Sequence, residues 1–328
     1  AMSIGGDMNY QTSDITSDYN SLSFMDAYKS CRLCPRSCGV DRYRESGFCG
    51  CGPVAKAARA ALHQWEEPCI SGINGSGTVF FSGCTLRCCF CQNYKISSEG
   101  FGREISLSRL ADIFLELQEQ GAHNINLVTA TQYVPSVIQA LDRVKGRLTI
   151  PVVYNCGGYE SLETIRTLEP YIDIWLPDLK YMDSSLSRRY SAAPDYFEAA
   201  SEAVKLMIRQ TGPLVFEDFS DGQQTCRLMK RGTIIRHMVL PGQKEDSIRL
   251  LDWISRSLPR EQFLISLMSQ YTPFYKSQDY PEINRRITTY EYEKVVDHAI
   301  ALGLDSGFMQ EKSSAKEEYT PPFELQGI

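Results

Sequence analysis

The fold of this chain is decided by one stretch, Phe80-Phe81-Ser82-Gly83-Cys84-Thr85-Leu86-Arg87-Cys88-Cys89-Phe90-Cys91-Gln92-Asn93-Tyr94. Three of its cysteines, Cys84, Cys88 and Cys91, have the spacing CxxxCxxC. The apolar pair at the start of the stretch, followed by a small Ser-Gly step, predicts a short buried strand that ends just before the first cysteine. The three thiols are therefore expected on one tight loop at the end of a strand.

Three thiolates on one loop suit three irons of a [4Fe–4S] cluster and leave the fourth iron open to another ligand. Ordinary electron-transfer clusters take four protein cysteines, so the missing fourth ligand is informative. A zinc knuckle or a chance group of cysteines is the alternative interpretation. The strand expected before the loop and the pattern that follows it favour the iron–sulfur site.

Composition places the chain among ordinary globular proteins. It has 328 residues, of which 43% are hydrophobic and 23% are charged, enough for a large core. The formal net charge is −6 and no basic arm is present, which argues against nucleic-acid binding. The sequence contains neither an apolar run of membrane-spanning length nor a recognisable signal peptide, so we expect a cytoplasmic protein without membrane association.

A second group of cysteines precedes the first. Cys31, Cys34, Cys38 and Cys49 have metal-ligand spacing, and Cys51 is a spare thiol that might replace Cys49 as fourth ligand. The chain has 12 cysteines in all, and such clusters indicate metal sites in a reducing compartment rather than disulfides. Four thiolates suit zinc and a [4Fe–4S] cluster equally, so the spacing predicts a second metal without choosing between them.

After the CxxxCxxC loop, segments with strand and helix patterns alternate. Such alternation predicts parallel strands joined by right-handed helical crossovers, with functional residues at the carboxyl ends of the strands. The expected strands are 78–82, 125–129, 148–153, 172–176, 233–240 and 263–268. We expect four regions: a disordered tail over 1–20, a cysteine-rich knuckle over 21–60, the main domain over 61–310 and a C-terminal tail over 311–328.

The segment 55–70 reads as a linker from the knuckle to the main domain. It contains His63, Trp65, Glu66 and Glu67. A lone histidine and an acidic pair in a linker are most often surface or packing residues, and we expect that here.

Seven motifs together resemble the radical SAM (S-adenosylmethionine) superfamily, and within it the activase-related proteins of the pyruvate formate-lyase activating-enzyme group. They are the CxxxCxxC loop with Gln92-Asn93-Tyr94, Trp65-Glu-Glu-Pro68, Tyr154-Asn-Cys-Gly-Gly-Tyr159, Leu176-Pro-Asp-Leu-Lys180, Arg236-His-Met-Val-Leu-Pro-Gly242, Ser266-Leu-Met-Ser-Gln-Tyr271 and Tyr280-Pro-Glu-Ile-Asn-Arg285. The resemblance implies a partial (β/α)6 TIM-like barrel, preceded here by the small cysteine-rich metal-binding segment. It also implies a [4Fe–4S] cluster on Cys84, Cys88 and Cys91, with SAM bound at the open iron.

The resemblance further assigns residues at the strand ends by position. Asp178 and Lys180 would line the active site and act in catalysis. SAM would be held by six residues: Thr129, Thr131, Asn155, Gly157, Gly158 and Arg236. Thr129-Ala-Thr131 stands where activating enzymes carry Gly-Gly-Glu, and Asn155 replaces an aspartate, so backbone groups and hydroxyls would meet the SAM amino group and a monovalent cation is not implied.

The function implied is reductive cleavage of SAM to a 5′-deoxyadenosyl radical, which abstracts hydrogen from a substrate. The electron would come from a one-electron donor such as flavodoxin or ferredoxin, and the substrate would be a glycyl-radical enzyme. The extra cysteines precede the barrel rather than follow the CxxxCxxC loop, so activase function is suggested by relatedness alone. The alternatives are a radical SAM enzyme that modifies a peptide or small molecule, and a non-catalytic Fe–S or zinc interaction protein.

Overall fold

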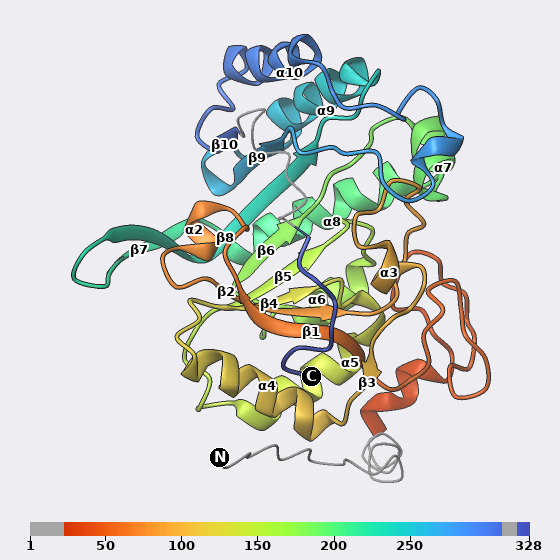
Figure 1. Cartoon of the computed structure of the whole chain (residues 1–328), viewed down its shortest axis with the longest axis vertical. Coiled ribbons are helices and arrows are strands. Elements are labelled where there is room, and N and C mark those ends of the chain that lie inside the picture. The colour runs from red at the N-terminus through yellow and green to blue at the C-terminus, as the bar shows by residue number, and fades with distance from the viewer. Residues whose placement is uncertain (1–22, 310–319) are drawn as a thin grey trace, which may run out of the picture.

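A mostly parallel sheet forms the centre of the computed structural model, which describes residues 23–309 and 320–328 (Figure 1). Its strands follow the order β10-β9-β8-β6-β5-β4-β2-β1-β3. The six strands predicted from the sequence correspond to β2 (Ser76–Phe81), β4 (Ile125–Val128), β5 (Val152–Cys156), β6 (Ile174–Pro177), β8 (Thr225–Met238) and β9 (Leu264–Met268). Each of these six pairs in parallel with the next, and the outermost strands of the sheet do not pair, so the barrel is open. The predicted α/β partial barrel is confirmed.

Helices cover the outer face of this sheet. They are α4 (Leu107–Glu119), α5 (Val134–Val144), α6 (Leu162–Leu168), α7 (Ser184–Ser191), α8 (Tyr196–Thr211), α9 (Lys244–Ser257) and α10 (Thr289–Ala301). The α4 helix begins after Ser106, whose hydroxyl accepts the Arg109 amide hydrogen, and α10 begins with a capping box between Thr288 and Glu291. Short elements complete the chain: η1 (Ser23–Tyr28), α2 (Pro68–Ser71), α3 (Tyr94–Ser97), η2 (Thr131–Tyr133), η3 (Arg260–Gln262), η4 (Ser277–Asp279), β3 (Arg103–Glu104), β7 (Val215–Ser220) and β10 (Phe308–Met309).

The main core lies between the sheet and its helices. The apolar face of α4 is fully buried there, including Leu110 and Phe114, against strand residues such as Val79 and Leu127. A second core joins β8 and β9 to α8, α9 and α10. Within the described part of the chain, the helices are too short or too polar to cross a bilayer.

The structure differs from the sequence prediction at strand β1 (Lys56–His63), which was expected to be linker. This strand pairs antiparallel with β2 and brings an antiparallel edge to the sheet. Its Lys-Ala-Ala-Arg-Ala-Ala-Leu-His sequence lacks β-branched and aromatic residues, and its buried positions do not alternate, so it carries no strand signal. The predicted strand 233–240 is instead the second half of β8, whose first half forms a protruding hairpin with β7 (Figure 1).

The end of the chain is part of the sheet region rather than a free tail. Residues 320–328 run along β1, where the Leu325 amide donates to the Ala58 carbonyl at 3.1 Å and the Ala60 amide donates to the Gln326 carbonyl at 2.8 Å (Figure 1). The Phe323 ring packs edge-on against Phe80, with centroids 5.4 Å apart. The predicted tail over 1–20 lies outside the described residues, as does the part 311–319 of the predicted tail over 311–328.

Deleting residues 320–328 is therefore expected to lower the free energy of unfolding by about 2–4 kcal/mol, because two backbone hydrogen bonds and the contact of Phe323 are lost. Urea unfolding followed by circular dichroism would measure this change. Glu324→Gln is the matched control, since Glu324 is exposed in the same segment. Equal stability of the truncated and full chains would contradict the contribution assigned to this segment.

Candidate active site

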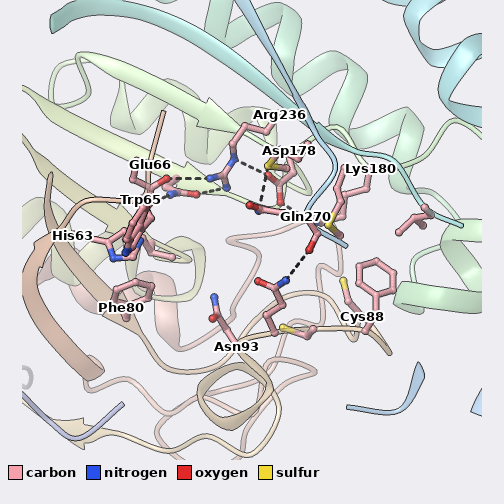
Figure 2. Close-up of a pocket in the computed structure, with 18 residues that line it drawn as sticks. His63, Trp65, Glu66, Phe80, Cys88, Asn93, Asp178, Lys180, Arg236 and Gln270 are labelled. Carbon is pink, nitrogen blue, oxygen red and sulfur yellow. Dashed lines mark hydrogen bonds and ion pairs between the residues drawn. The ribbon is translucent and has the colours of Figure 1, made fainter. Parts of the chain in front are cut away.

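A cavity of about 220 Å³ opens at the carboxyl ends of the parallel strands (Figure 2). One wall carries the CxxxCxxC loop, through Cys88 and Cys91, and a facing wall carries charged residues from β6 and β8. The cavity thus lies where an open α/β barrel concentrates functional residues.

The three cysteines of the loop lie beside hydrogen-bonding partners. The Cys84 sulfur accepts the Leu86 amide at 3.4 Å. The Cys88 sulfur is 3.0 Å from the Ser191 hydroxyl, and the Cys91 sulfur is 3.2 Å from the Ser97 hydroxyl. Hydrogen bonds to the sulfur ligands tune the reduction potential of an iron–sulfur cluster.

The donor set of this loop fits a four-iron cluster. Burial raises the pKa of the Cys84 thiol to about 12 and that of Cys91 to about 11, so cluster binding must release their protons. Over residues 23–309 and 320–328, no three Cys, His, Asp or Glu side chains lie close enough together to bind a single metal ion. Three thiolates on one loop suit three irons of a cluster, with a different iron for each cysteine.

A connected set of charges forms the facing wall. The Asp178 carboxylate bridges two cations: it accepts from the Lys180 ammonium at 2.5 Å and from the Arg236 Nε at 3.0 Å. The Arg236 guanidinium also donates to the Asn155 side-chain oxygen at 2.6 Å and to Glu66 at 3.3 Å (Figure 2). Lys180, Asn155 and Glu66 thus hold the Asp178–Arg236 pair in place, so the wall is preorganised.

Burial alone would disfavour every charge in this wall. Burial acts against ionisation of Asp178, but the charges of Lys180 and Arg236 outweigh it and lower the pKa of the carboxyl. Burial also acts against the charged form of Lys180, yet the Asp178 carboxylate raises the pKa of the ammonium. The wall therefore keeps a carboxylate and two cations beside the cysteine loop.

The structure brings together six of the residues singled out in the sequence. Cys88, Cys91, Asn155, Asp178, Lys180 and Arg236 all line the cavity. Gly158 stands behind this wall with a φ of +80°, and a Cβ there would lie 2.1 Å from the Asp178 carbonyl oxygen, so only glycine fits. The Gly157 carbonyl accepts from the Tyr196 hydroxyl at 2.8 Å. Both glycines shape the site through backbone.

Thr129 and Thr131 are less directly connected to the cavity. The Thr129 carbonyl accepts from the Gln132 side chain at 2.7 Å, and the residue adopts a φ of +56°. The Thr131 hydroxyl is buried and donates to Glu160 at 2.7 Å. A SAM-binding role for these two threonines stays a prediction.

Sequence reasoning missed the contribution of the segment before β2. His63 and Glu66 were expected at the surface or in packing, but both line the cavity, and so does Trp65 beside them (Figure 2). Burial raises the pKa of Glu66, and its ion pair with Arg236 opposes that effect. The Trp65-Glu-Glu-Pro68 motif was the available signal, but only the folded chain shows that it reaches Arg236, 170 positions away.

Comparison with known proteins decides the family. A sequence profile described as the radical SAM superfamily matches residues 78–254, which is more than half of the chain. This chain belongs to the radical SAM superfamily. It is therefore an enzyme of the radical SAM class, and its fold implies a [4Fe–4S] cluster and SAM as cofactors.

Three relatives illustrate how this radical SAM protein compares with known chains. It is 29% identical to the uncharacterized protein MJ0674 of Methanocaldococcus jannaschii over 288 residues, which is 85% of this chain and 76% of that one. It also resembles Streptococcus suis SuiB bound to its precursor peptide SuiA (TM-score 0.46, 15% identity, 70% of this chain and 46% of SuiB). A domain of pyruvate-formate lyase-activating enzyme from Bacteroides vulgatus matches with TM-score 0.38 and 14% identity over 54% of this chain and 93% of that domain. This radical SAM chain spans less than half the length of SuiB, and these structural likenesses carry no inference about its substrate.

A buried carboxyl lies behind the active site of this radical SAM protein. Glu160 is 2% exposed and accepts from the Thr131 hydroxyl at 2.7 Å and the Tyr154 hydroxyl at 3.1 Å. Burial raises its pKa from 4.5 to about 7, although both hydrogen bonds oppose the shift. Between pH 4.5 and about pH 7, Glu160 is therefore protonated in the folded chain and ionised in the unfolded chain.

Because its pKa is raised in the folded state, protonated Glu160 stabilises the fold. This stabilisation is present below pH 4.5 and is lost as the pH rises through about 7. Between pH 5 and pH 8, titration of Glu160 should lower the free energy of unfolding of the wild type by about 2–3 kcal/mol. Glu160→Gln is expected to remove this part of the decline. Urea titrations at both pH values would measure it. Glu163→Gln, at an exposed position on α6, is the control. An unchanged pH dependence in Glu160→Gln would refute the raised pKa.

Proposed function

We propose that this protein reductively cleaves SAM and uses the product radical to abstract a hydrogen atom from a substrate held in the cavity. The observation that carries the proposal is the arrangement of Cys88 and Cys91 opposite the ion-paired wall of Asp178, Lys180 and Arg236. When bound, the cluster supplies the electron that breaks a carbon–sulfur bond of SAM. The protein supplies orientation and exclusion of water.

The charged wall suits the polar end and the ribose of SAM. Arg236 and Asn155 offer a donor and an acceptor at the strand ends, and their mutual hydrogen bond orients both. The Lys180 ammonium lies near the Cys88 thiol, and a cation there favours a bound anionic cluster and a ligand carboxylate. Thr129, Thr131, Gly157 and Gly158 complete the proposed SAM site, largely through backbone groups.

For the substrate, we propose a polypeptide segment of a glycyl-radical enzyme, which would make the protein an activase. Trp65 is 50% exposed at the cavity wall, and Gln92, Asn93 and Gln270 line the same space. An exposed indole and amide side chains suit a peptide backbone with small side chains. A free peptide or small molecule is the alternative substrate.

The electron donor and the N-terminal cysteines belong to the same proposal. A flavodoxin or ferredoxin would deliver the electron, and Cys31, Cys34, Cys38 and Cys49 would bind a second metal, either zinc or an iron–sulfur cluster. We expect a cytoplasmic compartment that keeps thiols reduced, because the cysteines fall into clusters with metal-ligand spacing.

Anaerobic incubation with SAM and dithionite tests the proposal. Formation of 5′-deoxyadenosine and methionine is expected, and its absence from iron-loaded protein would overturn the assignment. Addition of a candidate glycyl-radical protein, followed by electron paramagnetic resonance (EPR), tests the activase role. A doublet from a carbon-centred radical on the partner supports it, whereas modification of a peptide or small molecule alone would favour the alternative.

A further inference from the structure

The last turn of α7 is attached to the CxxxCxxC loop. The Ser191 hydroxyl lies 3.0 Å from the Cys88 sulfur, and the Ser191 carbonyl accepts from the Arg87 amide at 3.1 Å. The Tyr190 carbonyl accepts from the Cys89 amide at 2.8 Å. The end of this helix therefore holds the loop on both sides of a cluster ligand.

The outer side of the same helix forms one wall of an open groove of about 490 Å³. Five residues line the groove: Ser184, Ser185, Arg188, Arg189 and Tyr280. Both arginines are exposed, and α7 lies at the edge of the molecule (Figure 1). The whole chain carries a formal net charge of −6, so a groove with two arginines in its lining is a local departure from an acidic protein.

Arg189 is held over this groove by neighbouring side chains. Its guanidinium pairs with Glu282 at 2.8 Å and lies 4.9 Å from the centre of the Tyr280 ring. The Tyr280 ring packs edge-on against Tyr190, with centroids 5.6 Å apart. Since the Tyr190 carbonyl accepts from Cys89, packed side chains and backbone connect the groove to the CxxxCxxC loop.

The groove is also close to the loop along the helix. Arg188 and Ser191 are three residues apart in α7, which is about 4.5 Å along the helix axis. The groove therefore lies within about one helical turn of the residue that contacts Cys88. Electron transfer between proteins slows steeply with distance, so a donor seated here would be well placed to reduce a cluster on the loop.

We propose that the groove lined by Arg188, Arg189 and Tyr280 is the docking surface for a one-electron donor protein with an acidic face. The inference rests on the proposed SAM cleavage and adds the place where its electron enters. Opposite charges steer two proteins together and fix their orientation, and exposed guanidinium groups can meet carboxylates without any opening of the fold. The donor loses one electron, the cluster on the loop gains it, and no bond is formed or broken.

The test compares the full wild-type chain, reconstituted with iron and sulfide, with the variant Arg188→Glu/Arg189→Glu. Reduction of the cluster by a reduced flavodoxin, whose surface around the flavin is acidic, is followed by stopped-flow absorbance without SAM. The variant is expected to be at least about tenfold slower at low salt, and salt should narrow the difference because it screens the charges. With light-reduced 5-deazariboflavin, an uncharged small reductant, the two rates are expected to be equal.

Arg166→Glu/Arg209→Glu is the matched control, because these exposed arginines on α6 and α8 give the same change in net charge. It should be reduced by flavodoxin at the wild-type rate. Arg188→Gln covers the case in which the first double variant does not fold, since it leaves the ion pair of Arg189 with Glu282 intact. It should be about threefold slower with flavodoxin at low salt.

Three results would overturn the docking surface. They are an unchanged flavodoxin rate in the groove variants, an equal loss of rate in the control, and failure of both flavodoxin and a ferredoxin to reduce the wild type. If the deazaflavin-reduced protein did not cleave SAM while the difference in flavodoxin rates persisted, that result would instead count against the proposed function alone.

Discussion

Cys88→Ala is expected to abolish reductive cleavage of SAM, with 5′-deoxyadenosine falling to the background of the assay. The substitution removes the thiolate from one iron at the wall of the cavity. Cys84→Ala and Cys91→Ala should have the same effect. Chromatography of anaerobic reactions with dithionite would measure the product, and iron analysis would show the loss of the cluster.

Cys89→Ala is the matched control, one residue away in the same loop. Its thiol is buried in the second core, and the residue's hydrogen bonds to neighbouring segments are made by backbone: its amide donates to the Tyr190 carbonyl and its carbonyl accepts from the Lys276 amide, both at 2.8 Å. Removal of the sulfur should cost about 1 kcal/mol of stability and leave cleavage intact. Cleavage at the wild-type level by Cys88→Ala would rule out the cluster assignment.

Asp178→Asn should lower the turnover number by about 100-fold while the free energy of unfolding falls by only about 1–2 kcal/mol. The asparagine oxygen can still accept from Arg236, which limits the structural cost. The change nevertheless removes the charge that Lys180 and Arg236 share, and it leaves Arg236 with Glu66 as its remaining ion-pair partner in the wall. Single-turnover kinetics and urea unfolding would separate the two effects.

Asp246→Asn is the control, because the Asp246 carboxylate has a similar burial but lies outside the cavity. Asp246 accepts from the Met182 and Asp183 amides, both at 3.0 Å, and pairs with Arg249. The substitution should reduce stability by an amount similar to Asp178→Asn and leave turnover unchanged. Equal losses of turnover in both variants would show that Asp178 acts through folding rather than at the active site.

Much of the fold could be predicted from the sequence because its helices and strands carry local signals. The ends of α4 and α5 carry such signals, since an apolar stripe, a serine cap and a first-turn proline mark them without reference to the rest of the chain. The CxxxCxxC spacing identified the cluster loop because its ligands are neighbours in sequence. Asp178, Lys180 and Arg236 were placed at the active site by the resemblance to the radical SAM superfamily, in keeping with parallel strands that gather their carboxyl ends at one edge.

Other features depend on residues that are distant in sequence. Strand β1 is alanine-rich and becomes a strand only because β2 supplies its hydrogen-bonding partners. Glu66 is indistinguishable from a surface acid until the fold carries it to Arg236. The end of the chain looked like a polar tail, but its backbone pairs with β1.

The sequence by itself determined the chemistry of this protein: three thiols on one loop, a second set of thiols upstream, and a strand–helix alternation that builds an open barrel. Only the tertiary structure decided how these parts meet. It brought Cys51 into contact with Gly83, and it closed a wall of ion pairs from three separate segments. The physical reason is that ligand spacing and hydrophobic period are local properties, whereas contacts across a barrel exist only once the strands have paired.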